Sequence, residues 1–138
     1  TDWLIANEVE MEGLLGEVGV RTKVEGSASE LAGHIPQWSE AIGCNLVVTL
    51  GAKGALGFAP EDGAFFAEAP VVTAVDTVGA GDCFVGYFVS LMSHGSHWQG
   101  ALQGAVAAAS ESVQRPGAQS SYPARADAER FRALAAGT

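Results

Sequence analysis

Residues 76 to 82, which read DTVGAGD, carry the strongest chemical signal in the sequence. The Val-rich run at 71–75 predicts a strand before them, and an apolar helical stretch begins at Asp82. The small residues Gly79, Ala80 and Gly81 allow backbone N–H groups to come close to a ligand. A helix start adds unpaired N–H donors and a partial positive charge. We therefore predict that this turn binds a phosphate.

Asp82 stands at the same predicted helix start. A carboxylate beside a bound phosphate is unfavourable in a pure binding site, because the two negative charges repel. It is useful if the acid orients a hydroxyl that attacks the phosphate and accepts its proton. Small residues between a strand and a helix are often only a tight turn. The preceding Asp-Thr pair and the apolar helix after the turn favour a functional role over a purely structural one.

Composition limits the function classes. The chain of 138 residues fits one domain, and 7 Lys and Arg against 16 Asp and Glu give a net charge of −9. This excess of negative charge argues against nucleic acid and against an anionic membrane surface as binding partners. With so few cations, a phosphate must be held by backbone donors and a metal ion, and we infer Mg²⁺ from this.

Cysteine usage indicates a cytoplasmic protein. Cys44 and Cys83 form no C-x-x-C pair and are expected to be buried free thiols. No signal peptide or membrane-spanning run is visible. Because the sequence opens on Thr1, almost inside a strand, we expect further residues to precede it in the full-length protein. The three His and three Trp residues are expected to have structural roles.

The elements that must position these residues alternate between strand and helix. A strand is predicted for residues 3–6. The helix after it is expected to be capped by Asn7 and Glu10, and a second helix by Ser27 and Glu30. Pro36 is expected to break or restart the second helix. The apolar run 46–50 predicts a strand buried on both faces.

Later segments continue the pattern. We expect a hairpin from 55–59 and 64–68, a helix at 82–93 that is buried nearly all round, and an Ala-rich helix at 98–113. A loop at 115–118 and an amphipathic helix at 126–136 complete the sequence. Alternating strands and helices predict the α/β class.

Four separated segments, which occur along the chain in the order expected for the family, resemble the ribokinase-like, or phosphofructokinase-B type, carbohydrate kinases. Their amino-acid sequence is nearest to that of ribokinase. They are the DTVGAGD segment, the Asn-x-x-Glu motif from Asn7 to Glu10, the glycine loop at 48–54 and the RPGAQSS segment at 115–121. The resemblance covers essentially the whole chain. It implies a three-layer α/β/α fold with a mostly parallel sheet. It also implies that residues 1–138 are the C-terminal nucleotide-binding and catalytic portion, without the N-terminal sugar-binding portion and lid.

The resemblance also implies site residues. Asp82 would be the catalytic base, and the N–H groups of Ala80, Gly81 and Asp82, after Gly79, would hold the transferring phosphoryl group. Asn7 and Glu10 would lie near the phosphates, with Glu10 acting on Mg²⁺ through water. The nucleotide site would comprise Thr49, Gly51, Gly54 and Lys53. A K⁺ site would be formed by Asp76, Val78, Ser112, Arg115, Gly117 and Ser121.

The implied activity is ATP-dependent phosphorylation of a sugar hydroxymethyl group, with the fragment inactive alone. Ribose is the first choice of substrate, although fructose, 2-keto-3-deoxygluconate and nucleosides fit the same machinery. The full-length protein would be a homodimer. One departure from the family is Val106, which stands where a polar residue near adenine is common.

Other interpretations remain open. The chain could be a non-catalytic module that binds ATP or ADP. A dinucleotide-binding oxidoreductase is weaker, since residue 84 is Phe where the third glycine of G-x-G-x-x-G would stand, and no acidic residue follows at the distance needed for a ribose. A Walker P-loop is absent from the sequence. Asn7 and Glu10 could be only a helix cap, and Lys53 only a solvated loop lysine.

Overall fold

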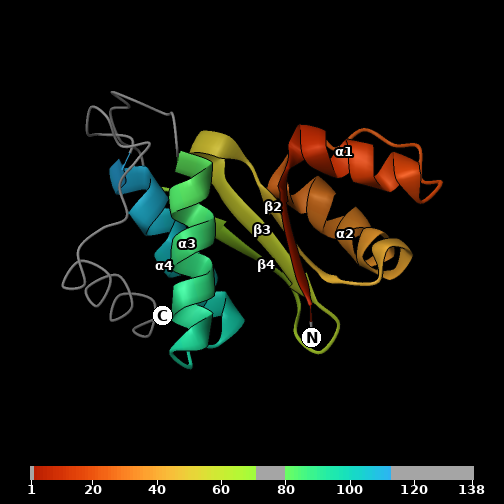
Figure 1. Cartoon of the computed structure of the whole chain (residues 1–138). Helices are drawn as coiled ribbons and strands as arrows, with labels where there is room; N and C mark the ends of the chain where they lie inside the picture. The colour runs from red at the N-terminus through yellow and green to blue at the C-terminus, as the bar shows by residue number, and fades with distance from the viewer. Residues whose placement is uncertain (1, 71–79, 113–138) are drawn as a thin grey trace. The chain divides into compact units, whose positions relative to one another are not determined.

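The computed structural model describes residues 2–70 and 80–112 (Figure 1). The chain divides into two compact units, residues 1–66 and 67–138, and each is described by itself.

The first unit is built on a mixed four-stranded sheet with the strand order β1-β2-β3-β4. Its elements, in chain order, are β1 (Trp3–Asn7), α1 (Glu8–Glu17), α2 (Ala28–Ile42), β2 (Asn45–Thr49), the 3-10 turn η1 (Gly51–Lys53), β3 (Gly54–Ala59) and β4 (Gly63–Glu68), whose last two residues cross into the second unit. The α/β class and the strands expected near 3–6, 46–50, 55–59 and 64–68 are confirmed.

Connection lengths explain why the sheet is mixed. β1 and β2 are parallel, with Trp3 opposite Asn45 and Asn7 opposite Thr49. The chain between them carries two helices, which is enough for a crossover. β2 and β3 are antiparallel, because the short segment between them cannot return the chain to the starting edge. The expected strand at 71–75, which bears on how far the sheet is parallel, lies outside the described residues.

Both helices of the first unit begin with a capping box. Asn7 caps α1 and Ser27 caps α2, and in each box the third helical residue, Glu10 or Glu30, bonds back to the backbone of the cap. α2 ends at Gly43, whose φ of 86° is the left-handed conformation that favours glycine. Both predicted caps are therefore confirmed.

The prediction that Pro36 breaks the second helix is wrong, since α2 runs from Ala28 to Ile42 with Pro36 inside it. Pro36 is exposed, so the lost hydrogen bond faces water. Ile35 and Trp38 on the neighbouring turns are buried. Burial of these side chains holds the helix together across the proline.

The core of the first unit lies between the sheet and these two helices, which also contact each other (Figure 1). Leu46, Val47 and Val48 of β2 are fully buried, as expected for a strand covered on both faces. The other large, fully buried side chains around them include Met11, Leu15, Leu31, Ile35 and Leu56. This core fixes where β1 and β2 end, and so where the residues that follow them lie.

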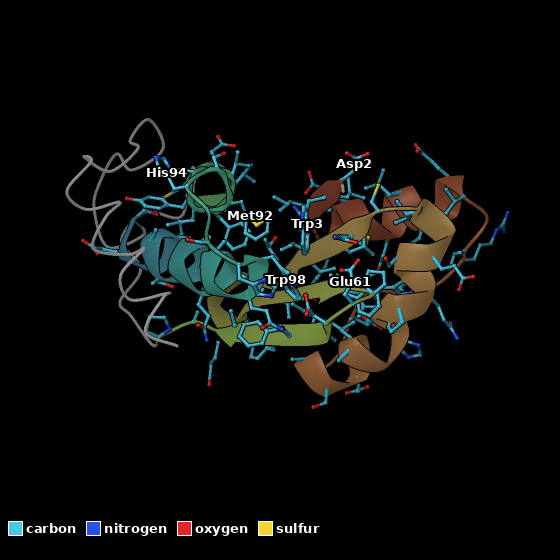
Figure 2. All side chains as sticks on the ribbon, turned by 90° about the horizontal axis from the view of Figure 1, so that it is seen from below. Asp2, Trp3, Glu61, Met92, His94 and Trp98 are labelled. Atoms are coloured by element: carbon cyan, nitrogen blue, oxygen red, sulfur yellow. The ribbon has the colours of Figure 1, made fainter. Side chains whose placement is uncertain are left out.

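The second unit contains two helices that pack against each other, α3 (Ala80–Ser93) and α4 (Trp98–Ser112). Figure 2 labels Met92 near the end of α3 and Trp98 at the beginning of α4. Small residues such as Ala101 and Ala105 are fully buried on α4, which permits close packing. The helices expected at 82–93 and 98–113 are thus confirmed within two residues of their ends.

The expectation that α3 is buried nearly all round is wrong. Phe84, Tyr87 and Phe88 are buried, but Val85 is 39% and Val89 53% exposed in this chain. These valines lie one turn apart, on a stripe with the exposed Asp82 and Ser93. The helix therefore has an apolar stripe open to solvent as well as a buried one.

The remaining structural expectations mostly hold. Cys83 is buried, whereas Cys44 is only half-buried, and both are free thiols. Trp38 and Trp98 are buried, and the three His side chains are exposed. Within residues 2–70 and 80–112, no helix is long and apolar enough to cross a membrane.

Candidate functional site

The carboxyl ends of β1 and β2 bring two predicted site residues together. Asn7 and Thr49 form the last Cα pair of the parallel ladder, so the chain leaves both strands at the same edge of the sheet. Asn7 is exposed and Thr49 is half-buried. In open α/β sheets, ligands bind beyond the carboxyl ends of the strands. This edge is therefore the candidate site of the first unit.

The α1 cap places a carboxylate at this edge. The Glu10 N–H donates to Asn7 Oδ1 at 2.8 Å, and the Asn7 N–H donates to Glu10 Oε1 at 2.9 Å. That bond occupies one oxygen of an exposed carboxylate, which leaves Oε2 to accept from a metal-bound water. The predicted Mg²⁺ contact through water therefore fits this side chain. Among the described residues, no three His, Cys, Asp or Glu side chains gather into a cage that could hold a metal directly.

The loop after β2 has the backbone geometry of a close-approach turn. Gly51 and Gly54 have φ values of +60° and +128°, which L side chains rarely adopt. The Leu50 N–H donates to the Gly54 carbonyl at 2.8 Å, and the Lys53 N–H donates to the Leu50 carbonyl at 3.2 Å. These bonds close the loop. A Cβ built on Gly51 would meet nothing within 4 Å, so the backbone there is open to a ligand.

Lys53 is exposed at the end of this loop. It is a cation within a short loop that follows Thr49, so it could meet a phosphate, and equally it could remain solvated. Its contact with a phosphate stays a prediction.

In the second unit, the predicted phosphate turn continues into α3, which begins at Ala80. Gly81 and Asp82 are both exposed in the first turn, and a Cβ on Gly81 would meet nothing within 4 Å. The first N–H groups of a helix have no partners within the helix. Asp82 therefore stands in the first turn of α3, where backbone donors have no partner within the helix, and its role toward a phosphate stays a prediction. An acid in a first turn also stabilises the helix dipole, so a structural role is compatible with the same position.

Part of the predicted cation site falls outside the described residues. These residues are Asp76, Val78, Arg115, Gly117 and Ser121, and Gly79 of the predicted phosphate turn lies outside the described residues as well. Ser112 ends α4, and its Oγ donates to the Ala109 carbonyl at 2.8 Å. Val106 is buried, with 5% of its surface exposed.

The hollow of about 730 Å³ in the first unit lies elsewhere. It runs along α1 and the loop after it, and its lining includes Val9, Gly13, Gly16 and Val20. Its lining includes neither Asn7 nor Thr49. The lining also includes four polar or charged residues, Glu12, Arg21, Thr22 and Lys23. We nevertheless place the candidate site at the strand ends, because ligands of open α/β sheets bind beyond the carboxyl ends of the strands.

Sequence reasoning did not anticipate the role of Leu50. Its backbone N–H closes the glycine loop, and its side chain is buried in the core cluster. The loop is thereby anchored to the core from its first residue. The spacing of Gly51 and Gly54 was the available signal, but a glycine pair does not reveal which backbone bond closes the turn.

Comparisons with known proteins identify the family of the chain. Residues 1–125 match the pfkB family of carbohydrate kinases. A deoxyribokinase from Salmonella typhi is 36% identical over 123 residues, which cover 88% of this chain and 38% of the relative. The crystal structure of a ribokinase from Thermotoga maritima has a TM-score of 0.76 at 37% identity, covering 94% of this chain and 41% of that one.

A ribokinase from Arabidopsis thaliana, solved with ribose and ATP, has a TM-score of 0.77 at 29% identity and covers 95% of this chain and 40% of its own. The chain thus spans about two fifths of the length of the relatives that it matches.

Proposed function

Because the chain belongs to the pfkB family of carbohydrate kinases, we propose that it is the C-terminal nucleotide-binding and catalytic portion of an ATP-dependent sugar kinase. The full polypeptide transfers the γ-phosphoryl group of ATP to a hydroxymethyl group of a sugar. Ribose or deoxyribose is the proposed acceptor, because similar proteins are a ribokinase and a deoxyribokinase. The rest of the polypeptide supplies most sugar contacts, and the protein works as a cytoplasmic homodimer.

The observation that carries the proposal is the pairing of Asn7 with Thr49 at the ends of two parallel strands. A capped helix follows one strand and a loop with two positive-φ glycines follows the other. This combination offers backbone donors, an amide and a hydroxyl at one sheet edge, which suits the phosphates of a nucleotide. We assign Thr49, Gly51, Gly54 and Lys53 to the nucleotide.

The transfer step depends on position and charge, since phosphoryl transfer passes through a loose transition state. We propose that Asp82 orients the sugar hydroxyl and accepts its proton as the new O–P bond forms and the bond to the ADP oxygen breaks. The N–H groups of Ala80, Gly81 and Asp82 donate to the phosphoryl oxygens, and Gly79 lets the backbone approach. The Glu10 carboxylate would hold Mg²⁺ through a water molecule, and the bound ion would supply positive charge beside the phosphates.

Monovalent-cation activation is part of the proposal. Asp76, Ser112 and Ser121 would supply oxygen ligands for K⁺, with carbonyls of Val78, Arg115 and Gly117. A rate that rises in K⁺ over large organic cations is the expected result. Equal rates in Na⁺, K⁺ and organic cations would exclude this cation from the mechanism.

The test is a kinase assay of the full polypeptide with ATP, Mg²⁺ and a panel of ribose, deoxyribose, fructose and nucleosides. ADP and the phosphorylated sugar should form in equal amounts. The 138-residue chain alone should form neither, because the sugar contacts are missing. A full polypeptide that phosphorylates none of these acceptors would overturn the proposal.

A second candidate is a non-catalytic module that binds ATP or ADP. It is favoured by one observation: the helix N-terminus after Asn7 and the glycine loop after Thr49 suit nucleotide phosphates by themselves, and neither requires a sugar acceptor. Titration calorimetry with ADP separates the two candidates when combined with the assay. Binding without turnover by the full polypeptide would support the module.

A further inference from the structure

We propose that a groove beside α1 binds an extended segment of a partner protein in which acidic and apolar residues alternate. The groove is the hollow of about 730 Å³ between α1 and residues 20–23, and we refer to it as the α1 groove. It lies apart from the strand-end site, because neither Asn7 nor Thr49 lines it. The inference goes beyond the proposed function and does not depend on it.

The segment after α1 is fixed to that helix at both of its ends. The Val20 N–H donates to the Leu15 carbonyl at 2.8 Å, and the Val24 N–H donates to Glu12 Oε1 at 2.7 Å. Val24 is 2% exposed, and Val20 packs against the core. The segment therefore runs back along α1 (Figure 1). Residues 21–23 are exposed between these two anchors and are already held in place, so a partner orders them at little entropic cost.

This segment forms the positive wall of the α1 groove. Arg21 and Lys23 are exposed, and neither forms an ion pair with a carboxylate of the described residues. They are two of only 7 Lys and Arg in a chain of net charge −9, so a wall that carries both can attract an acidic partner. The N–H groups of residues 21–23 donate no hydrogen bond within the described part of the chain, so they can donate to the carbonyls of an extended peptide.

The acidic residues near this wall leave the two cations available. Glu12 lines the α1 groove, but its Oε1 accepts the Val24 N–H and its side chain is half-buried. Glu17 and Glu25 are exposed and are not part of the lining. The carboxylates of a partner can therefore meet Arg21 and Lys23 without displacing an ion pair between described residues.

The opposite wall is apolar and permits close approach. Val9, Gly13 and Gly16 lie on one face of α1, since they are spaced by four and three residues. Val9 is 78% exposed, and a Cβ built on either glycine would meet nothing within 4 Å. Successive side chains of an extended peptide point to opposite sides. A peptide that alternates acidic and apolar residues therefore matches both walls at once.

The openness of the α1 groove favours a peptide over a small molecule. Sites for small molecules bury about 70–90% of the ligand, whereas most residues lining this groove are exposed. An extended peptide compensates by contacts along its whole length and by main-chain hydrogen bonds. A second copy of this chain is a poorer occupant, because none of the four described strands carries acidic residues at alternate positions.

Fluorescence anisotropy of the full polypeptide with a labelled peptide, acetyl-Gly-Glu-Val-Glu-Val-Glu-Gly-amide, tests the proposal. We expect saturable binding that weakens as salt is added. Arg21→Glu and Lys23→Glu should each raise the Kd by about 5-fold or more at low salt. Lys53→Glu is the matched control, because it makes the same change of charge outside the α1 groove and should leave the Kd of the peptide unchanged. Equal effects of all three substitutions would overturn the proposal.

The peptide itself supplies further controls. Replacement of its three Glu residues by Gln should weaken binding by about 5-fold or more, and equal binding of both peptides would contradict an acidic partner. Excess ADP should not displace the Glu peptide. Displacement by ADP would place the peptide at the nucleotide site and overturn the inference. Absence of binding would also overturn it, whether the rest of the polypeptide or a second copy covers the groove.

NMR of the full polypeptide locates the bound peptide. The amide signals of Gly13, Gly16 and residues 21–23 should shift on titration, while that of Gly63 in the β3–β4 turn should not. Shifts confined to the loop at 51–54 would reject the α1 groove. Kinase activity is scored separately. An inactive polypeptide that binds the peptide here rejects the proposed function alone, and an active one that does not bind it rejects only this inference.

Discussion

Asn7 and Thr49 are partners in the last register pair of the parallel β1–β2 ladder. A helix N-terminus begins directly after Asn7, and a loop with positive-φ glycines begins two residues after Thr49. The helix N-terminus, which can accept an anion, and the glycine loop, which permits close backbone approach, therefore lie side by side at one edge of the sheet. The predictions for the first unit follow from this pair.

The two capping boxes allow the proposed metal role of Glu10 to be separated from its capping role. Glu10→Gln keeps a side chain that can accept the cap N–H but removes the negative charge. We expect little change in the unfolding midpoint, and a Mg²⁺ requirement of the full kinase that rises by roughly 10- to 100-fold, as for other groups that orient metal-bound water. A Mg²⁺ titration of the reaction rate measures this.

Glu30→Gln is the matched control, because Glu30 makes the same bond in the α2 box, with its Oε1 accepting from the Ser27 N–H at 3.2 Å. We assign Glu30 no role in the reaction. Both variants should melt alike, and only Glu10→Gln should change the Mg²⁺ titration. Identical titrations for the two variants would leave Glu10 as a helix cap and nothing more.

Gly51→Ala tests whether a nucleotide approaches the glycine loop. Gly51 has φ +60° and open space where a Cβ would stand, so alanine costs about 1–2 kcal/mol of backbone strain and meets no clash within the protein. Gly63, in the hairpin, has φ +81° and similar open space. We expect comparable destabilisation of both alanine variants, but a loss of ADP affinity of at least about 10-fold only for Gly51→Ala. Calorimetric ADP titrations that weaken equally in both variants would argue against a ligand at this loop.

Pro36→Ala should stabilise the first unit. Alanine restores a helical N–H donor and removes the ring from the interior of α2, which is worth about 3 kcal/mol in helix propensity. The unfolded chain of the alanine variant is more flexible, and this lowers the gain in stability by up to about 1 kcal/mol. We expect the free energy of unfolding to rise by about 2 kcal/mol, measured by denaturant titration. Gln37→Ala, at the exposed neighbouring position, should change it little, and a loss of stability in Pro36→Ala would show that the proline fits its helix better than propensity suggests.

Much of the fold could be predicted from local sequence signals. Asn7 with Glu10 and Ser27 with Glu30 marked both helix starts, because a capping box is defined by residues three apart. The continuous apolar run of β2 marked a strand covered on both faces. These features depend on near neighbours in the sequence, so a single sequence contains them.

Other features depend on tertiary contacts and could not be predicted in this way. α2 continues through Pro36 because Ile35 and Trp38 are buried on either side of it, which no local propensity reveals. The apolar composition of α3 suggested burial all round, but Val85 and Val89 are exposed. The pairing of Asn7 with Thr49 is likewise a matter of register between strands about forty residues apart, and composition carries no information on it.

Asp82 has two possible roles in the first turn of α3, and its replacement separates them. If the carboxylate is the proton acceptor, Asp82→Asn in the full polypeptide lowers kcat by at least about 100-fold and leaves ADP affinity nearly unchanged. If it only interacts favourably with the helix dipole, the variant melts earlier but turns over normally below its melting range. The discriminating measurements are kcat, ADP affinity and the unfolding midpoint on one preparation. Because Asn is nearly isosteric with Asp and can still cap or donate, a large loss of kcat without a comparable loss of stability points to the missing base. Retained kcat would remove Asp82 from the reaction and leave the helix start as an anion-binding feature alone.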